Sequence, residues 1–378
     1  YLNLNTCRFL WKQVKFPLAT DVPNAGTKVV KQGEVQGSDI AAHSAGILDL
    51  KTTILPDADA LFVTAVDKYG HELWRWIFPI DKLNQVKEEL SPLSGKATYT
   101  ETDNDLTVKA NNHTFVFSKK DGQLKGVSVN NRKISFANGP RFIGARRADR
   151  SLDQFYNHDD EKAKEKDRTY SEFPDAAVFT KLDVREDGGN LIITANYKLG
   201  NLDKAQWTIN PSGIVTLDYT YNFSGVVDLM GICFDYPEEQ VISKRWLGAG
   251  PYRVWQNRIH GTQYDIWEND YNDPIPGETF TYPEFKGYFG DVSWMNIRTK
   301  EGTISLTNET PGTYIGIYQP RDGRDRLLYT LPESGISVLN VIPPVRNKVN
   351  STDLCGPSSQ PKWVNGSQTG RIVFRFTE

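Results

Sequence analysis

Alternation of apolar and polar residues dominates the chain and predicts short β-strands from its first residues onward. The apolar runs at residues 60–66 and 73–78 flank Lys68-Tyr-Gly70, a sequence typical of a hairpin turn. Phe9 and Trp11 belong to a further apolar set near the start of the chain. Short strands packed into about 100 residues are typical of an immunoglobulin-like β-sandwich. We therefore predict such a sandwich over residues 1–80.

The same alternation returns after residue 96 and continues to the end of the chain. Turn signals recur at roughly 8–12 residues, and sustained helical periodicity is scarce, as expected of a large antiparallel all-β domain. We assign this domain to residues 97–378. Its predicted strands lie at residues 113–118, 124–129, 191–197, 205–209, 214–223 and 371–376.

Residues 81–96 read DKLNQVKEELSPLSGK and separate the two predicted domains. Their helical periodicity is weak, they contain no strand signal, and they end in Ser-Pro and Ser-Gly. We expect them to form the interdomain linker.

Composition excludes several classes of partner. The chain has 378 residues, 38% hydrophobic and 24% charged, with a formal net charge of -3. Without an excess of positive charge, nucleic acid and anionic membrane are poor partners. No apolar run approaches the roughly 20 residues of a transmembrane helix.

Three cysteines, Cys7, Cys233 and Cys355, lie far apart and show no C-x-x-C spacing. They indicate buried free thiols, because this number and spacing suit neither a disulfide scaffold nor a zinc site. The chain begins YLNLNTC, without an initiator methionine and without the charged and then apolar residues of a signal segment. We expect a longer parent protein, periplasmic or secreted if its N-terminus carries a signal peptide and otherwise cytoplasmic.

Residues 246–296 contain four of the nine tryptophans, together with repeated Gly and Pro. The sequence WLGAGP at residues 246–251 lies at the end of an apolar strand, and its glycines and proline are typical of a turn. Tyr252, Trp255 and Arg258 follow, and they combine flat apolar faces with polar donors. This combination suits a carbohydrate-contacting surface or a subunit contact. The alternative is the wall of a large β core with ordinary connecting turns.

The segment resembles the C-terminal domain of family 2 β-galactosidases, whose pattern is roughly W-L-G-x-G-P-x-E-x-Y-x-D-R followed by Y-x-x-P-Q-E-x-G. The resemblance rests on WLGAGP at 246–251, NR at 257–258, YPE at 282–284 and the upstream GPR at 139–141. The chain departs from the pattern at Arg253, Trp255, Asn257, Phe285 and Ser293. The resemblance implies a many-stranded antiparallel super-sandwich related to galactose mutarotase, preceded by the family's small sandwich domain.

The family's catalytic carboxylates lie at the strand ends of a (β/α)₈ barrel, and this chain shows no βαβ alternation. We therefore assign no catalytic residue. Trp363 stands where the family has a D-S-W phrase on a loop that reaches the active site, so the resemblance implies sugar stacking on its ring. The alternative is that Trp363 covers the edge of the sandwich. Further candidate carbohydrate contacts are Trp255, Arg258, His260 and Glu284.

Two other chemistries remain open. His260 and Glu284 could form an acid and base pair of the mutarotase kind, although a hydrogen-bonded structural histidine is the alternative. The oxygen-rich stretch ENDYND at residues 268–273 has spacings that could hold Ca²⁺. It lacks the glycine and the distal glutamate of an EF-hand, and a solvated loop is the alternative. We expect no cofactor, with Ca²⁺ as the alternative.

The resemblance implies the C-terminal, non-barrel portion of a β-galactosidase-like glycoside hydrolase. Its expected partners are a carbohydrate and the catalytic barrel, and a homo-oligomer is left open. Two alternatives come from other classes, a free-standing carbohydrate-binding sandwich protein and a mutarotase-like aldose epimerase. The sequence determines neither the sugar nor the linkage.

Overall fold

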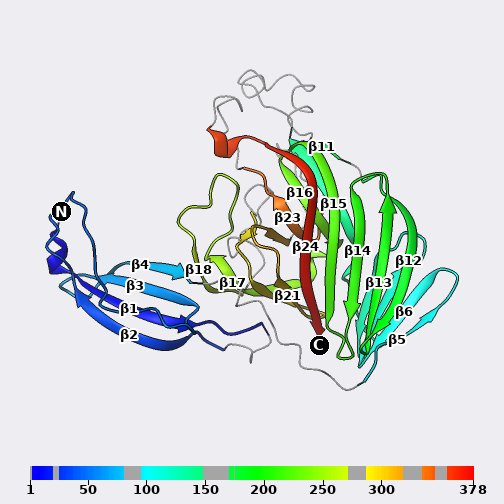
Figure 1. Cartoon of the computed structure of the whole chain (residues 1–378), viewed down its shortest axis with the longest axis horizontal. Helices are drawn as coiled ribbons and strands as arrows, with labels where there is room; N and C mark the ends of the chain where they lie inside the picture. The colour runs from blue at the N-terminus through cyan, green and yellow to red at the C-terminus, as the bar shows by residue number, and fades with distance from the viewer. Residues whose placement is uncertain are drawn as a thin grey trace. The chain divides into compact units, whose positions relative to one another are not determined.

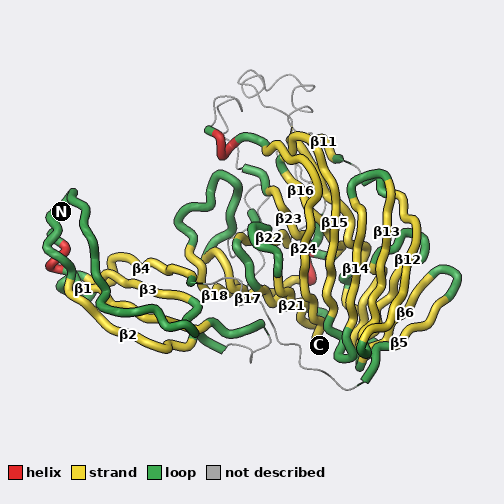
Figure 2. Tube along the Cα trace, in the orientation of Figure 1, coloured by secondary structure: helices red, strands yellow, loops and turns green. Residues whose placement is uncertain are grey.

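The computed structural model describes residues 2–19, 25–80, 95–147, 170–173, 175–270, 287–317, 334–344 and 356–378. The chain divides into two compact units: Tyr1–Glu89 with Gln263–Ile266, and Leu90–Thr262 with Trp267–Glu378. Strands make up nearly all regular structure of the described residues (Figure 2), which confirms the predicted all-β class. The short 3-10 helices are η1 (Leu4–Thr6), η2 (Glu238–Gln240) and η5 (Pro357–Ser359). No helix among the described residues has the length and apolar character needed to cross a membrane.

In the first unit, the strands between residues 8 and 79 form one four-stranded antiparallel sheet in the order β2-β1-β3-β4 (Figure 1). The predicted hairpin turn is confirmed, because Asp67 and His71 are joined by a 3.0 Å backbone hydrogen bond and Gly70 has a φ of +89°. The strands are β1 (Arg8–Lys15), β2 (Lys28–Gln36), β3 (Ala60–Val66) and β4 (Glu72–Pro79).

One face of this sheet forms the small core of the first unit. Phe9, Trp11 and Val63 are buried there, and Leu48 and Leu50 pack against them from the segment between β2 and β3. Full burial of such a side chain stabilises the fold by about 1.5–3 kcal/mol.

The second unit contains two large antiparallel sheets among its described residues. The first runs in the order β19-β22-β23-β16-β10-β8-β7-β6-β5, with β11 paired to β10 and β9 paired to β8. Its strands are β5 (Thr98–Glu101), β6 (Asp105–Ala110), β7 (His113–Ser118), β8 (Leu124–Val129), β9 (Arg132–Ile134), β10 (Ala137–Arg147), β11 (Tyr170–Glu172), β16 (Leu229–Asp235), β19 (Phe289–Gly290), β22 (Tyr314–Ile317) and β23 (Ile336–Val341).

The second sheet runs in the order β12-β13-β14-β15-β24-β21-β20-β17-β18, and it carries the residues considered below. Its strands are β12 (Val178–Asp187), β13 (Asn190–Lys198), β14 (Leu202–Ile209), β15 (Val215–Val227), β17 (Val241–Gly250), β18 (Gln263–Asn269), β20 (Trp294–Thr299), β21 (Gly302–Asn308) and β24 (Lys362–Thr377).

A large hydrophobic core joins the two large sheets, because alternate side chains of each sheet point into the space between them. Phe136 lies at its centre. Its ring stacks on Phe234 of the first sheet, with 4.6 Å between centroids, and lies 5.2 Å from Phe374 of the second. The core explains the predicted alternation, since the residues between the core positions face outward.

The last strand is much longer than the sequence predicts. Residues 371–376 have the expected apolar alternation, whereas β24 begins at Lys362 and pairs with the whole of β15, from Val215↔Phe374 to Val227↔Lys362. Residues 362–370 are polar and glycine-rich, so their strand conformation is determined by pairing with β15 rather than by local sequence preference. Of the predicted linker, residues 81–94 lie outside the described residues.

Candidate functional site

Residues 246–250 of the WLGAGP motif form the end of β17, and two indole groups hydrogen-bond to their backbone. Trp246 is fully buried, its ring meets Phe289 edge-on at 4.9 Å, and its Nε1 donates a 3.0 Å hydrogen bond to the carbonyl of Ala249. Trp267 Nε1 donates a 3.1 Å hydrogen bond to the carbonyl of Gly248. A side chain at Gly250 would overlap the ring of Trp267, so glycine is required at this close approach. The end of β17 is therefore a rigid base for the loop that follows.

The loop after β17 is anchored by a buried residue and then turns. Val254 is fully buried and exchanges backbone hydrogen bonds of 2.7 and 3.0 Å with Tyr288. The amide of Arg258 then donates a 2.9 Å hydrogen bond to the carbonyl of Trp255, which closes a tight turn. This turn holds Trp255 half-buried and leaves Arg258 exposed.

Cationic side chains pack around an aromatic ring beneath this loop. The Arg253 guanidinium lies 5.0 Å and the Lys244 ammonium 5.8 Å from the centroid of the Phe289 ring. Both cationic residues are buried. Cation–π attraction of this kind contributes about 0.5–2 kcal/mol, and it helps to hold the base of the loop.

The same loop is joined to the segment that leads into β24. The side-chain amide of Gln256 donates hydrogen bonds of 2.9 Å to the carbonyl of Ser358 and 2.7 Å to that of Gln360. The Asn257 amide donates a 2.9 Å hydrogen bond to Ser359 Oγ. Trp363 follows three residues after Gln360, near the start of β24, and its side chain is 69% exposed. The loop and the approach to Trp363 therefore form one connected surface.

The structure places the predicted residues as follows. Trp255 and Arg258 share the tight turn, His260 is exposed further along the same loop, and Trp363 is exposed at the start of β24. Glu284 lies outside the described residues. Gln256 was missed by sequence reasoning, because nothing in a single chain distinguishes it from the polar residues beside it.

In the described part of the chain, no group of three or more His, Cys, Asp or Glu residues could hold a metal ion. Within the ENDYND stretch, Glu268 lies 3.8 Å from the Arg245 guanidinium. Asp273 lies outside the described residues, and Ca²⁺ binding there stays a prediction.

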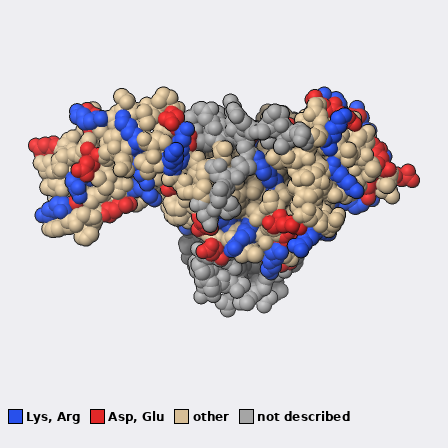
Figure 3. All heavy atoms as spheres, turned by 90° about the horizontal axis from the view of Figure 1, so that it is seen from below, with Lys and Arg blue, Asp and Glu red and all other residues tan. Residues whose placement is uncertain are grey.

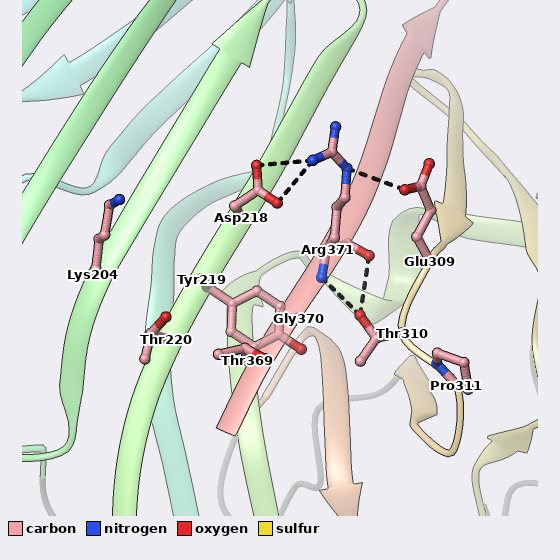
Figure 4. Close-up of a pocket in the computed structure, with 10 residues that line it drawn as sticks. All are labelled: Lys204, Asp218, Tyr219, Thr220, Glu309, Thr310, Pro311, Thr369, Gly370 and Arg371. Carbon is pink, nitrogen blue, oxygen red and sulfur yellow. Dashed lines mark hydrogen bonds and ion pairs between the residues drawn. The ribbon is translucent and has the colours of Figure 1, made fainter. Parts of the chain in front are cut away.

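A second candidate is a hollow of ≈ 390 Å³ over β14, β15 and β24, shown in Figure 4. Arg371 of β24 lies between two carboxylates: its Nη1 is 3.2 Å from Asp218 Oδ1, and its Nε is 3.1 Å from Glu309 Oε2. Its backbone amide donates a 2.7 Å hydrogen bond to Thr310 Oγ1. Lys204 lies on the opposite side of the hollow in Figure 4. Sequence reasoning missed this site, whose residues are up to 167 positions apart in the sequence from Lys204 to Arg371.

The architecture defines an all-β protein in which two large antiparallel sheets enclose a shared hydrophobic core. The chain belongs to the beta-galactosidase small chain family, whose model matches residues 109–340. The resemblance inferred from the WLGAGP segment is thereby confirmed.

Other comparisons add structural likenesses. A search of curated proteins found no match. A galactose 1-epimerase from Lactobacillus acidophilus NCFM is 10% identical, with 75% of this chain and 99% of that chain covered and a TM-score of 0.41. A GalM/aldose epimerase homologue from C. elegans is 7% identical, with 75% and 99% covered and a TM-score of 0.33. Similarities of this size do not define an activity for this chain.

Proposed function

We propose that this chain is the C-terminal, non-barrel portion of a β-galactosidase-like glycoside hydrolase, in which it supplies scaffold and carbohydrate contacts. The substrate class is O-glycosides, and the two catalytic carboxyl groups belong to a barrel outside this chain. Family membership supports the glycosidase context. The proposed part is that the barrel carries out catalysis while this chain contributes scaffold and carbohydrate contacts.

The observation that carries the proposal is the hydrogen-bonded connection between the loop after β17 and the approach to Trp363. Gln256 and Asn257 hold the 358–360 segment through side-chain amides. A segment fixed in this way can present an exposed indole in one position without ordering it when sugar binds, which lowers the entropic cost of binding.

The proposed role of Trp363 is to bind sugar by stacking. One indole face can pack against the C–H groups of a pyranose ring, while donors such as Arg258 donate hydrogen bonds to its hydroxyl groups. Such a contact contributes equally to ground-state and transition-state binding, and we assign it no part in proton transfer or nucleophilic attack.

The experiment is a kinetic comparison in the complete protein encoded by the gene, with the barrel present. Trp363→Ala should raise KM for aryl β-galactosides and leave kcat nearly unchanged, as expected when uniform binding is lost. Trp74→Ala provides a matched control, because Trp74 is also exposed but lies on β4. Unchanged kinetics for several galactosides and glucosides would mean that Trp363 only covers the sheet edge.

Binding and activity assays on the same complete protein distinguish the two alternative functions. A free-standing sugar-binding sandwich would bind saccharide without any associated hydrolase activity. An epimerase would interconvert the anomers of a free aldose, and His260→Ala would abolish that activity. The pairing of His260 with Glu284 stays a prediction, since Glu284 lies outside the described residues.

A further inference from the structure

The hollow in the nine-stranded sheet is lined by adjacent polar rows on neighbouring strands. Lys204, Thr220 and Thr369 are register partners across β14, β15 and β24, and Asp218 and Arg371 form the next row. These side chains share the sheet face opposite the hydrophobic core, because their core-facing neighbours in the strands are buried. The hollow is therefore built from regular strands, which position side chains more rigidly than loops do.

We propose that this hollow binds one neutral pyranose ring, at a site separate from Trp363. Trp363 and Arg371 are eight residues apart on β24, which corresponds to about 26 Å at roughly 3.3 Å per residue. One sugar ring cannot span that distance. The inference does not rest on the proposed function of Trp363.

The first argument is that Arg371 is held in place before any ligand arrives. Its guanidinium contacts Asp218 on one side and Glu309 on the other, and its backbone is bonded to Thr310. Its side chain is nevertheless 51% exposed, while those of Asp218 and Glu309 are 36% and 31% exposed. Charged donors and acceptors thus face the hollow in a fixed arrangement, and hydrogen bonds to charged groups are stronger than neutral ones.

The second argument concerns charge. Lys204 and Arg371 supply two cations, and Asp218 and Glu309 supply two anions, so the lining is formally neutral. Balanced charge of this kind favours a neutral ligand with many hydroxyl groups over phosphate or another anion. Figure 3 shows the same interspersion of positive and negative side chains on the face it draws, outside its grey atoms.

The third argument concerns shape and hydrogen-bonding capacity. A hollow of ≈ 390 Å³ lies near the lower end of the roughly 300–1,000 Å³ range of ligand pockets, which suits a single sugar ring. The hydroxyl groups of Thr220 and Thr369 can each donate and accept a hydrogen bond. Pro311 offers a small apolar surface for the C–H groups of the ring.

The test is direct binding to the full chain carrying Trp363→Ala, so that stacking on Trp363 contributes nothing. Saturation-transfer NMR titrations would use methyl β-galactopyranoside, methyl β-glucopyranoside, sodium glucuronate and inorganic phosphate. We expect saturable binding of a neutral glycoside, and binding about tenfold weaker after Asp218→Asn or Lys204→Ala, since each removes one charged hydrogen-bonding group.

Two further variants keep the outcome decisive. Thr220→Val removes only a hydroxyl group and should also weaken binding, so it replaces Asp218→Asn if that variant fails to fold. Asp183→Asn is the matched control, because Asp183 forms a comparable exposed ion pair with Lys181 at 2.8 Å on β12. The proposal is overturned if no neutral glycoside binds saturably, if glucuronate or phosphate binds more tightly, or if Asp183→Asn has the same effect as Asp218→Asn. Hydrolysis kinetics play no part in this test, so its failure is distinct from failure of the Trp363 proposal.

Discussion

Gln256 donates its side-chain amide to the carbonyl of Gln360 at 2.7 Å, across 104 residues of sequence. The same amide also bonds to the carbonyl of Ser358. These two hydrogen bonds connect the loop that carries the β-galactosidase-like motif to the segment that leads into Trp363. In the proposed function Gln256 is a positioning residue, because it would act on the sugar contact of Trp363 through the backbone rather than by touching the sugar.

Replacing Gln256 by Ala should therefore impair sugar binding through Trp363. Two carbonyl groups lose their donor, at a cost of about 1–3 kcal/mol in a partly buried setting. We expect faster amide hydrogen exchange in residues 356–361 and a raised KM in the complete enzyme, with kcat nearly unchanged. Gln32→Ala on the exposed edge strand β2 is the control. Normal exchange in residues 356–361 of the Gln256 variant would refute the positioning role.

Trp363→Ala should weaken sugar binding by about 1–3 kcal/mol, by analogy with other sites where a ring stacks on an aromatic side chain. Its side chain is 69% exposed, so the thermal unfolding midpoint should shift little. The measurement combines KM for a series of galactosides and glucosides with a thermal melt. A large fall in the unfolding midpoint together with normal KM would instead assign Trp363 a structural role.

Purified residues 1–378 should not hydrolyse nitrophenyl β-glycosides. Glycoside hydrolysis needs two carboxyl groups flanking the scissile bond, about 5–5.5 Å apart for retention or about 6.5–9.5 Å for inversion. The proposed function assigns that pair to a barrel outside this chain. The complete protein encoded by the gene serves as the positive control. Turnover by residues 1–378 that persists through stringent purification would contradict the assignment.

Phe136→Ala should destabilise the large domain by about 3–5 kcal/mol, because it opens a cavity in a core where the rings of Phe234 and Phe374 lie at 4.6 and 5.2 Å. Urea denaturation followed by tryptophan fluorescence would measure the change. Phe78→Ala is the matched control, since Phe78 is 51% exposed on β4 and should cost far less. Equal losses for both variants would mean that the ring cluster contributes little.

Burial raises the pKa of the Cys233 thiol from its ordinary value of 9.0 to about 11. The folded protein therefore keeps this proton where the unfolded chain loses it. The associated stability is fully present below pH 9 and is lost as the pH rises to about 11. Between pH 8 and pH 10, the wild type should lose about 1 kcal/mol more stability than Cys233→Ala. Urea titrations at both pH values would measure this difference, and parallel losses in the two proteins would exclude the effect.

Local patterns in the sequence determined much of the secondary structure. The predicted strands at 60–66, 113–118 and 124–129 coincide with β3, β7 and β8, because alternating apolar residues and turn chemistry act over a few neighbouring residues. The motif at residues 246–251 likewise indicated the family, and the family model confirms it. Its rigidity depends on the buried ring of Trp246 and the partly buried ring of Trp267, which both hydrogen-bond to carbonyl groups of the motif.

Only the tertiary structure decided which distant segments meet. The pairing of β15 with β24 brings Asp218 next to Arg371, 153 residues later, and extends β24 back to Trp363 through a polar stretch with little strand preference of its own. Strand register over such separations depends on which apolar faces pack into the shared core, and local sequence patterns do not reveal which distant strands pair. For the same reason the connection from Gln256 to Gln360 and the hollow around Arg371 could not be predicted. Both bring together groups that lie far apart in the sequence, a loop side chain and backbone carbonyls in the first case and side chains of paired strands in the second.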